Sequence, residues 1–256
     1  MNMISVIIIT KNEEKNIKRC LEGVLWADEI IIVDDESMDK TVEIAKNYDK
    51  TKVYIKKMEG FGEQKNFALS KASAEWVLNI DADEVVIPKL MQEILEKIEN
   101  ETKYSGYYLR RNNFVFGKFW LDYKPAALRL FKREKGKFTD MKVHEHVVVD
   151  GEVGFIKTPL LHYSNALSNV KDYVEIYLNN YTTKAVFDLK KKGVKIKKSN
   201  LIYYFVVKPF LIFIQKYFFK QYFKRGIRGL FLAQFVAIAY LVSYIKLWED
   251  QEKISK

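Results

Sequence analysis

The chain has 256 residues, of which 48% are hydrophobic and 14% aromatic, and its formal net charge is +10. This composition excludes an intrinsically disordered protein and suits one large domain, or one domain with an appendage. A single cysteine, Cys20, excludes a disulfide framework and a multi-cysteine zinc site. The first residues lead directly into a strand-like segment, so we expect no signal peptide.

The positive charge is concentrated in the C-terminal part of the chain. From residue 184 to the end there are 16 Lys and Arg against 4 Asp and Glu, an excess larger than the net charge of the whole chain. The preceding part is therefore slightly acidic. A basic segment of this kind indicates an anionic partner, either nucleic acid or an anionic membrane surface. Its high content of apolar residues favours the membrane.

The first hundred residues alternate between strand-like and helix-like patterns. Four strands, each followed by a helix, are expected at residues 4–9, 29–33, 52–55 and 76–81. The first is a β-branched run typical of a central parallel strand. The alternation predicts an open, mostly parallel α/β sheet with right-handed crossovers.

The fourth strand leads into the acidic segment Asn79-Ile80-Asp81-Ala82-Asp83-Glu84. Open α/β sheets bind their ligands at the carboxyl ends of strands. Asp81 and Asp83 are two residues apart, so their side chains point the same way if the strand geometry continues. Two converging carboxylates suit Mg²⁺ or Mn²⁺, which could hold a diphosphate. The alternative is an acidic turn that caps the helix beginning at Pro88, and the pair alone does not decide between the two.

A second acidic cluster lies at residues 34–39, after the second strand, and has four carboxylates in six positions. Carboxylates repel phosphate, but they accept hydrogen bonds from a base N–H or a ribose hydroxyl. Asp39 could instead cap the following helix. Capping explains one of these acids but not all four, so the cluster indicates a nucleoside pocket.

Residues 104–156 contain short aromatic strands that predict an antiparallel extension on the acceptor side of a cleft. Within it, a strand over Val143-His144-Glu145-His146-Val147 would place Glu145 on one face and the two histidines on the other. We interpret Glu145 as a general base. A His-x-His metal site and an ordinary polar edge strand are the alternatives. His162 is isolated, and a structural role is expected for it.

The C-terminal part predicts a helix over residues 169–192, a basic hinge around Gly193, and two apolar stretches at 201–219 and 230–245. Each stretch is slightly shorter than the ~20 residues that span a membrane. Aromatic residues alternate with lysines, which is typical of helices lying in the membrane interface. The alternative is a helical hairpin that packs on the body or on a second subunit.

Four blocks, in this order and spacing, resemble the family 2 glycosyltransferases with the GT-A fold. They are the strand and loop at residues 5–13, the Asp34-Asp35-x-Ser37-x-Asp39-x-Thr41 segment, Gln64-Lys65-Asn66, and Asp81-x-Asp83. The match covers about residues 3–165. The Val-His-Glu-His segment and the aromatic, basic C-terminal part are most similar to the lipopolysaccharide-core glucosyltransferases of the WaaE type. The Gln-x-x-Arg-Trp motif of the family's processive synthases is not found in the sequence, which favours transfer of a single sugar.

The resemblance implies a Rossmann-like GT-A domain over residues 1–165, with a nucleotide half to about residue 100 and an acceptor half after it. Residues 166–256 would form a helical, membrane-associating tail. Carried over by position, the nucleotide-sugar site comprises eight polar residues: Thr10, Asn12, Glu13, Asp34, Asp35, Asp39, Lys65 and Asp81.

Specific roles follow from the same resemblance. Asp35 would contact the base or the ribose, and Lys65 would reach the diphosphate. Asp81 would bind the ribose or support the metal, and Asp83 would ligate Mg²⁺ or Mn²⁺. Glu145 would take the proton of the acceptor hydroxyl as it attacks the anomeric carbon with inversion.

The expected protein is therefore a glycosyltransferase on the inner, cytoplasmic face of the cytoplasmic membrane. It would move one sugar, from UDP-glucose or a similar UDP-hexose, to a glycolipid or lipopolysaccharide-core acceptor. One alternative acceptor is a polyprenyl phosphate, for which Glu145 would be dispensable. Another alternative is a non-catalytic nucleotide-sugar-binding scaffold. Nucleic acid is not expected as a partner, because the acidic loops would repel its backbone.

Overall fold

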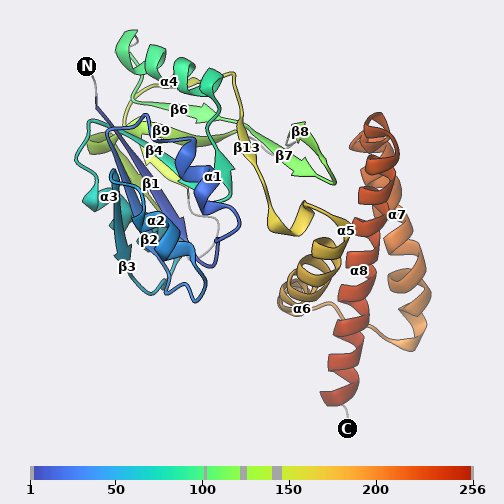
Figure 1. Cartoon of the computed structure of the whole chain (residues 1–256). Coiled ribbons are helices and arrows are strands. Elements are labelled where there is room, and N and C mark those ends of the chain that lie inside the picture. The colour runs from blue at the N-terminus through green and yellow to red at the C-terminus, as the bar shows by residue number, and fades with distance from the viewer. Residues whose placement is uncertain (1–2, 101–102, 122–125, 140–145, 255–256) are drawn as a thin grey trace. The chain divides into compact units, whose positions relative to one another are not determined.

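The computed structural model describes residues 3–100, 103–121, 126–139 and 146–254. The chain divides into two compact units, Met1–Ser164 and Asn165–Lys256, and each is described by itself (Figure 1). Glu145, together with His144, lies outside the described residues.

The N-terminal unit is built around a seven-stranded sheet with the order β12-β6-β9-β4-β1-β2-β3. Its parallel half consists of β1 (Ile4–Thr10), β2 (Glu29–Asp34), β3 (Thr51–Ile55) and β4 (Trp76–Asp81). β1 and β2 are buried along nearly their whole length, which explains why both are continuous apolar runs and not alternating ones. The sequence prediction of a mostly parallel α/β sheet is confirmed.

Helices cover both faces of this sheet. On one face α1 (Ile17–Glu22), α2 (Thr41–Lys46) and α4 (Pro88–Asn100) contribute to the larger apolar core. α4 does so with Leu90, Ile94 and Ile98, which recur every four residues on one side of the helix. On the other face α3 (Phe61–Lys71) packs Ala68 in a second core, together with Ala72, which follows the helix. This helix begins immediately after Gly60, so Gly62 belongs to its first turn.

The rest of this unit supplies the predicted antiparallel extension. In the main sheet, β9 (Ala127–Lys132) is antiparallel to both β4 and β6 (Gly106–Leu109), and β12 (Val153–Phe155) is parallel to β6. A second sheet contains β5 (Glu84–Val85), β13 (Leu160–His162), β7 (Arg111–Val115) and β8 (Lys118–Leu121). β10 (Gly136–Phe138) and β11 (Val147–Val149) form a two-stranded ribbon.

The C-terminal unit is helical. α5 (Val170–Asp172), a π-helical segment (Tyr173–Tyr181) and α6 (Thr182–Lys191) follow one another directly, over the range where the sequence predicts one helix. Gly193 ends this run with a φ of +71°, the left-handed conformation that glycine adopts most readily after a helix. The unit continues with a helix at Lys198–Phe219, which includes α7 (Lys208–Ile214), and one at Tyr222–Lys253, most of α8 (Gly226–Ile254).

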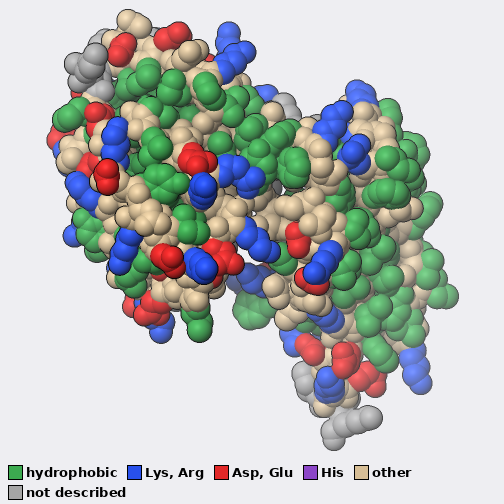
Figure 2. All heavy atoms as spheres, viewed as in Figure 1, with side chains coloured by type: hydrophobic (Ala, Val, Ile, Leu, Met, Phe, Trp, Pro, Cys, Tyr) green, Lys and Arg blue, Asp and Glu red, His purple; other side chains and the backbone are tan. Residues whose placement is uncertain are grey.

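Both of these last helices are long and apolar enough to cross a membrane by length and composition. They are longer than the apolar stretches at 201–219 and 230–245 that the sequence predicts, because each helix also includes polar residues at its ends. Only 11% of the apolar window of the first is buried. Hydrophobic side chains gather on the face of this unit seen in Figure 2, and Ile202 and Phe219 are 75% and 77% exposed.

Candidate active site

The carboxyl ends of β1 and β4 mark the point where the sheet changes direction. The chain runs from β1 to β2 and β3 on one side, and then places β4 on the other side of β1. A crevice forms at such a switch point in open α/β sheets, because the two loops diverge. Thr10 ends β1 and Asp81 ends β4, so the loop after β1 and the acidic segment after β4 flank this crevice. The other acidic cluster follows β2, the neighbouring strand.

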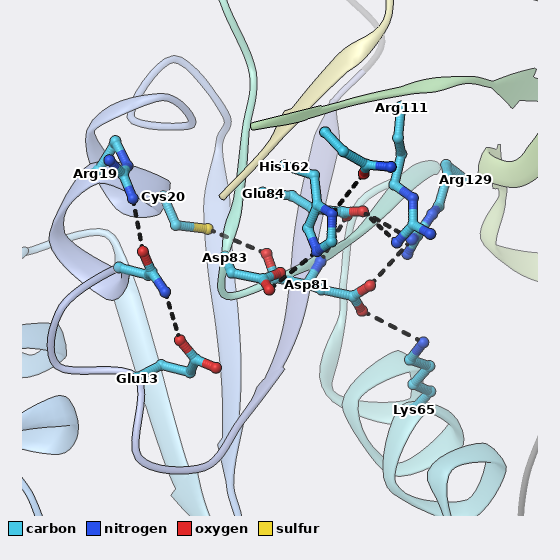
Figure 3. Close-up of polar contacts among 12 residues, drawn as sticks. Glu13, Arg19, Cys20, Lys65, Asp81, Asp83, Glu84, Arg111, Arg129 and His162 are labelled. Carbon is cyan, nitrogen blue, oxygen red and sulfur yellow. Dashed lines mark hydrogen bonds and ion pairs between the residues drawn. The ribbon is translucent and has the colours of Figure 1, made fainter. Parts of the chain in front are cut away.

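Glu84 organises the turn after β4, although its carboxylate is completely buried. Its Oε2 accepts the backbone N–H of Asp81 at 2.9 Å, and its Oε1 accepts from Arg129 at 3.0 Å and from Arg111 at 3.4 Å (Figure 3). Burial raises the pKa of Glu84 above its ordinary value, although the charge of Arg129 opposes this. The contact to the Asp81 N–H turns the chain away from the direction of the strand.

Asp81 lies between two cations. Its Oδ2 accepts from Arg129 at 3.0 Å, and its Oδ1 is 3.6 Å from Nζ of Lys65, which reaches it from α3. Burial alone would raise the pKa of Asp81, but the charge of Arg129, followed by that of Lys65, holds it well below the usual range. Asp81 is therefore ionised at neutral pH.

Asp83 faces a different partner. Its Oδ2 is 3.0 Å from Nε2 of His162, and the other ring nitrogen of His162 is 2.7 Å from Oδ1 of Asn113 (Figure 3). Burial lowers the pKa of His162, but the hydrogen bond and charge of Asp83 outweigh it and leave the pKa above its ordinary value. The condition under which Asp81 and Asp83 would point the same way is not met, because β4 ends at Asp81. Asp81 contacts Arg129, whereas Asp83 contacts His162.

The distance between Asp83 and His162 can be compared with the distance expected between two ligands of one cation. Adjacent ligands of an octahedral cation, each about 2.1 Å from the ion, are about 3.0 Å apart, which is the separation seen here. Among the described residues, no group of three or more His, Cys, Asp and Glu side chains could hold a metal. The two residues fit a cation that takes its other ligands from a diphosphate and water.

The loop after β2 is held by its own carboxylates. Asp34 accepts hydrogen bonds from the backbone N–H and the hydroxyl of Ser37. Asp39 accepts from the N–H and hydroxyl of Thr41, the first residue of α2, and from the N–H of Glu14 at 3.1 Å. Both acids therefore fix the backbone of the loop.

The loop after β1 is joined to the β2 loop. Asn12 has a φ of +53°, its N–H donates to the Ser37 hydroxyl at 2.8 Å, and its Oδ1 accepts the N–H of Met38 at 2.9 Å. The N–H of Glu13 donates to the Thr41 hydroxyl at 2.7 Å. These contacts hold the two loops as one wall of the crevice.

Asp35 contacts residues outside the β2 loop. Its Oδ2 pairs with Lys11 at 2.7 Å, and its Oδ1 accepts the N–H of Met58 at 2.8 Å. Burial raises its pKa, but the hydrogen bond from Lys11 lowers it below the ordinary value overall. The nearby Thr10 hydroxyl oxygen is buried and has no hydrogen-bond partner within the described residues.

A cavity of about 370 Å³ opens beside Asp81. Its wall combines side chains of β4 and β9 with Lys65 of α3, and the described residues that line it are Lys65, Asn79, Asp81, Tyr108, Ala126, Ala127, Leu128, Arg129, Phe138, His146 and Val147. Of the Gln64-Lys65-Asn66 block, only Lys65 reaches this cavity. Asn66 instead exchanges two hydrogen bonds with the backbone of Phe138, at 2.9 and 3.0 Å, and ties α3 to β10.

Comparison with known proteins decides the family. Residues 5–161 match the family model described as glycosyl transferase family 2. The chain belongs to the family 2 glycosyltransferases. It is accordingly an enzyme that uses a nucleotide sugar, and the matched residues span both the parallel half of the sheet and its antiparallel extension.

Relatives of this glycosyltransferase align over almost its whole length. An uncharacterized glycosyltransferase of Rickettsia typhi is 33% identical over 272 residues, which cover 97% of this chain and 88% of that protein. The lipopolysaccharide core biosynthesis glycosyltransferase LpsC of Rhizobium meliloti is 29% identical over 258 residues, covering 96% and 92%. The C-terminal helical unit is therefore included in the similarity.

A solved structure has the same fold. The crystal structure of S. aureus TarS 1–349 in complex with UDP-GlcNAc has a TM-score of 0.50 to this glycosyltransferase at 16% sequence identity, covering 98% of this chain and 92% of that one. At this identity the likeness shows the fold alone. The GT-A fold inferred from the sequence is confirmed.

Three residues of the site were not identified from the sequence. His162 was expected to be structural, yet it faces Asp83, and Arg129 and Glu84 had no role before their contacts with Asp81 were seen. His162 and Arg129 lie on β13 and β9, 79 and 48 residues from their carboxylate partners. The one available sequence signal was the position of His162 at the end of a short strand.

Proposed function

We propose that this glycosyltransferase moves one hexosyl group, from UDP-glucose or a similar UDP-hexose, to a membrane-borne glycolipid or lipopolysaccharide-core acceptor. The observation that carries the proposal is the pair of sites at the end of β4. Asp83 and His162 lie 3.0 Å apart, a separation that suits two ligands of one cation, and Asp81 holds Lys65 at the edge of a cavity. A diphosphate bound between these two sites would have the cation on one side and the Lys65 ammonium on the other.

In the transfer reaction, the main task of the residues around the donor is to stabilise the negative charge on the departing diphosphate. The bond between the anomeric carbon and the diphosphate oxygen breaks while the acceptor oxygen attacks from the opposite face, so the configuration inverts. Lys65 would stabilise the negative charge on the departing diphosphate. When bound, a divalent cation supplies further Lewis-acid stabilisation of that charge. Asp83 and His162 would hold this cation, and their mixed oxygen and nitrogen donors favour Mn²⁺ over Mg²⁺.

Glu145 is the proposed general base. It would take the proton from the acceptor hydroxyl as the new glycosidic bond forms. His146, the next residue in the chain, lines the cavity beside Asp81, and this supports a role for the segment near the reacting sugar.

The nucleoside would bind to the wall formed by the β1 and β2 loops. Asp35 is proposed to contact the base or ribose, because Asp34 and Asp39 use their oxygens to hold the loop itself. Thr10, whose hydroxyl lacks a partner among the described residues, would line the same pocket with Asn12 and Glu13. Asp81 is proposed to contact the ribose and to hold Lys65 in place.

The acceptor is proposed to be membrane-borne for two reasons. The relative LpsC is named for lipopolysaccharide core biosynthesis, and residues 190–256 combine lysines with exposed apolar and aromatic side chains. The enzyme would then lie on the cytoplasmic face of the cytoplasmic membrane.

Donor hydrolysis by the purified protein tests the proposal. UDP-glucose, UDP-galactose, UDP-N-acetylglucosamine and GDP-mannose would be supplied in parallel with Mn²⁺ or Mg²⁺, with Asp83→Ala as the control. Metal-dependent release of UDP from one donor is the expected result. Tight UDP binding without turnover, with membranes supplied as acceptor, would instead favour the non-catalytic scaffold. Transfer to a polyprenyl phosphate that survives Glu145→Gln would favour that acceptor.

A further inference from the structure

Two residues that line the cavity beside Asp81 each have a buried polar atom with no hydrogen-bond partner within the described residues. The atoms are Oδ1 of Asn79 and Nε of Arg129. The two residues are only 3% and 7% exposed. Buried polar groups are almost always paired, so two unpaired atoms in one cavity wall call for a ligand.

The sheet places these two residues near each other. β4 and β9 are antiparallel, and Leu78, which precedes Asn79, is paired with Leu130, which follows Arg129. Arg129 lies at an irregularity of β9, where the register with β6 passes from Leu130 to Leu128, and both Asn79 and Arg129 line the same cavity. Asp81, two residues after Asn79, also contacts Arg129.

The guanidinium of Arg129 cannot turn to satisfy its own Nε. Its Nη2 donates to both Asp81 and Glu84, each at 3.0 Å. Because the guanidinium is planar, these contacts fix the direction of the Nε–H bond as well. The wall therefore presents one fixed donor, from Arg129, and one acceptor, from Asn79.

A donor beside an acceptor is complementary to a hydroxyl group, which accepts one hydrogen bond and donates another. The cavity volume of about 370 Å³ falls within the range of about 300–1,000 Å³ that small-molecule sites occupy. Lys65 and Asp81, which we assign to the donor substrate, line the same cavity.

We infer that Asn79 and Arg129 together bind one hydroxyl group of the transferred hexose, which makes Asn79 a residue that determines sugar specificity. This inference rests on the proposed function, because it requires a nucleotide-sugar donor at Lys65 and Asp81. Arg129 also binds Asp81, so a substitution of Arg129 would disturb other parts of the site as well. A substitution of Asn79 therefore tests sugar recognition by itself.

The test compares Asn79→Leu with Asn112→Leu. Leucine has a similar volume and removes the acceptor oxygen. Asn112 is a matched control, because its Oδ1 is also buried and has no partner in the described part of the chain, but it lines a different cavity, with Ile87 and Leu161. Calorimetry with Mn²⁺ would give the Kd of UDP, UDP-glucose, UDP-galactose and UDP-N-acetylglucosamine, and of GDP and GDP-mannose, for each protein.

Asn79→Leu is expected to weaken binding of the preferred nucleotide sugar about tenfold while leaving the Kd of the free nucleotide within about twofold. Asn112→Leu should change neither value. A monodeoxy form of the preferred donor that lacks the recognised hydroxyl should bind the wild type and Asn79→Leu equally well.

Three results would overturn the inference. One is an unchanged affinity of Asn79→Leu for the preferred nucleotide sugar. Another is an equal loss of affinity for nucleotide and nucleotide sugar accompanied by a lower Tm, which would show a structural role. The third is a change confined to the KM of an acceptor. Failure of the wild type to bind any of these nucleotides would instead overturn the proposed function itself.

Discussion

At the scale of single residues, the pairing of Asp83 with His162 gives the most direct prediction. Asp83→Ala should abolish metal-dependent turnover, because it removes the carboxylate ligand. His162→Ala should raise the Mn²⁺ concentration needed for half-maximal activity by at least about tenfold, since losses of 10- to 100-fold in metal affinity follow even from changes around the ligands. Initial rates measured over a Mn²⁺ titration would show both effects.

Asp49→Ala serves as the control for this titration, because Asp49 is an exposed carboxylate in the turn before β3. Its Mn²⁺ dependence should equal that of the wild type. Full activity of Asp83→Ala at low Mn²⁺ would remove the metal assignment, and a normal Mn²⁺ dependence of His162→Ala would leave Asp83 without its proposed co-ligand.

Substitution of Glu84 by alanine is expected to reduce stability. Glu84→Ala removes the acceptor of the Asp81 N–H and one of the two carboxylate partners of Arg129. A buried donor left without its acceptor costs about 1–3 kcal/mol, so we expect a loss of about 3 kcal/mol once the lost packing is included. The midpoint of urea unfolding would report this change. An unchanged midpoint would mean that these contacts of Glu84 do not stabilise the turn.

The residues of this site differ in how far the sequence could predict them. Asp81, Asp83, Asp35 and Lys65 belong to local patterns, a strand followed at once by polar residues or a short helical block. Arg129 and His162 reach the site only because β9 pairs with β4 and β13 pairs with β5. Those pairings join segments far apart in the sequence, and no local pattern specifies them.

At the scale of secondary-structure elements, Glu29 connects four parts of the main sheet. Its carboxylate accepts from the hydroxyl of Ser5 on β1 at 2.6 Å, from the N–H and hydroxyl of Ser73 before β4, and from Lys52 on β3 at 2.8 Å. Burial would raise the pKa of Glu29, but these hydrogen bonds, led by that of Lys52, lower it to about 2.

Glu29→Gln should therefore reduce stability in a pH-dependent way. The pKa is lower in the folded state than the unfolded value of 4.5, so the ionised carboxylate stabilises the fold above pH 4.5 and this contribution is lost as the pH falls towards 2. We expect a loss of about 3 kcal/mol at pH 7 and less than half of that at pH 3. Urea unfolding at both pH values would measure the difference from wild type.

The control is Glu134→Gln, since the side chain of Glu134 is 85% exposed. Its effect on the unfolding free energy should be small and the same at both pH values. An equal loss for Glu29→Gln at pH 7 and pH 3 would contradict the assignment, because it would point to altered packing and not to the charge.

Elements with a strong local pattern were the ones that the sequence predicted well. β1 and β2 are β-branched runs, and α4 has apolar residues every four positions, so burial alone specifies them. The π-helical segment at Tyr173–Tyr181 was expected to be part of an ordinary helix. There the Lys246 ammonium donates to the Asn179 carbonyl at 3.1 Å and to the Thr182 hydroxyl at 2.8 Å, and this contact from α8 cannot be read from the local sequence.

At the scale of the whole molecule, charge and apolar exposure are distributed unevenly along the chain. The excess of basic residues lies after residue 184, in the same unit where Ile202, Phe210 and Phe219 are 75%, 60% and 77% exposed. Anionic lipid headgroups attract lysines, at about 1 kcal/mol each near the surface, and apolar side chains enter the interface. The two features together support binding to an anionic membrane.

Deleting residues 201–256 would be a poor test of this idea. The helix that precedes the deletion packs Val186 against Tyr244 and Leu247 of α8, so the deletion would expose the core of the unit that remains. Substitution of exposed side chains avoids this difficulty.

The triple variant Ile202→Ser, Phe210→Ser, Phe219→Ser should bind vesicles of phosphatidylglycerol and phosphatidylcholine at least about tenfold more weakly than the wild type. Each of these side chains contributes about 1.5–3 kcal/mol when fully buried in an apolar environment, so even partial insertion would produce a loss of this size. Co-sedimentation over a range of lipid concentrations would measure it.

The matched control is the double variant Ile55→Ser, Phe155→Ser, at positions of the N-terminal unit that are 56% and 61% exposed. Undiminished binding by the triple variant would count against insertion of these side chains, because lysines alone would then account for the association, and 0.5 M NaCl should abolish it.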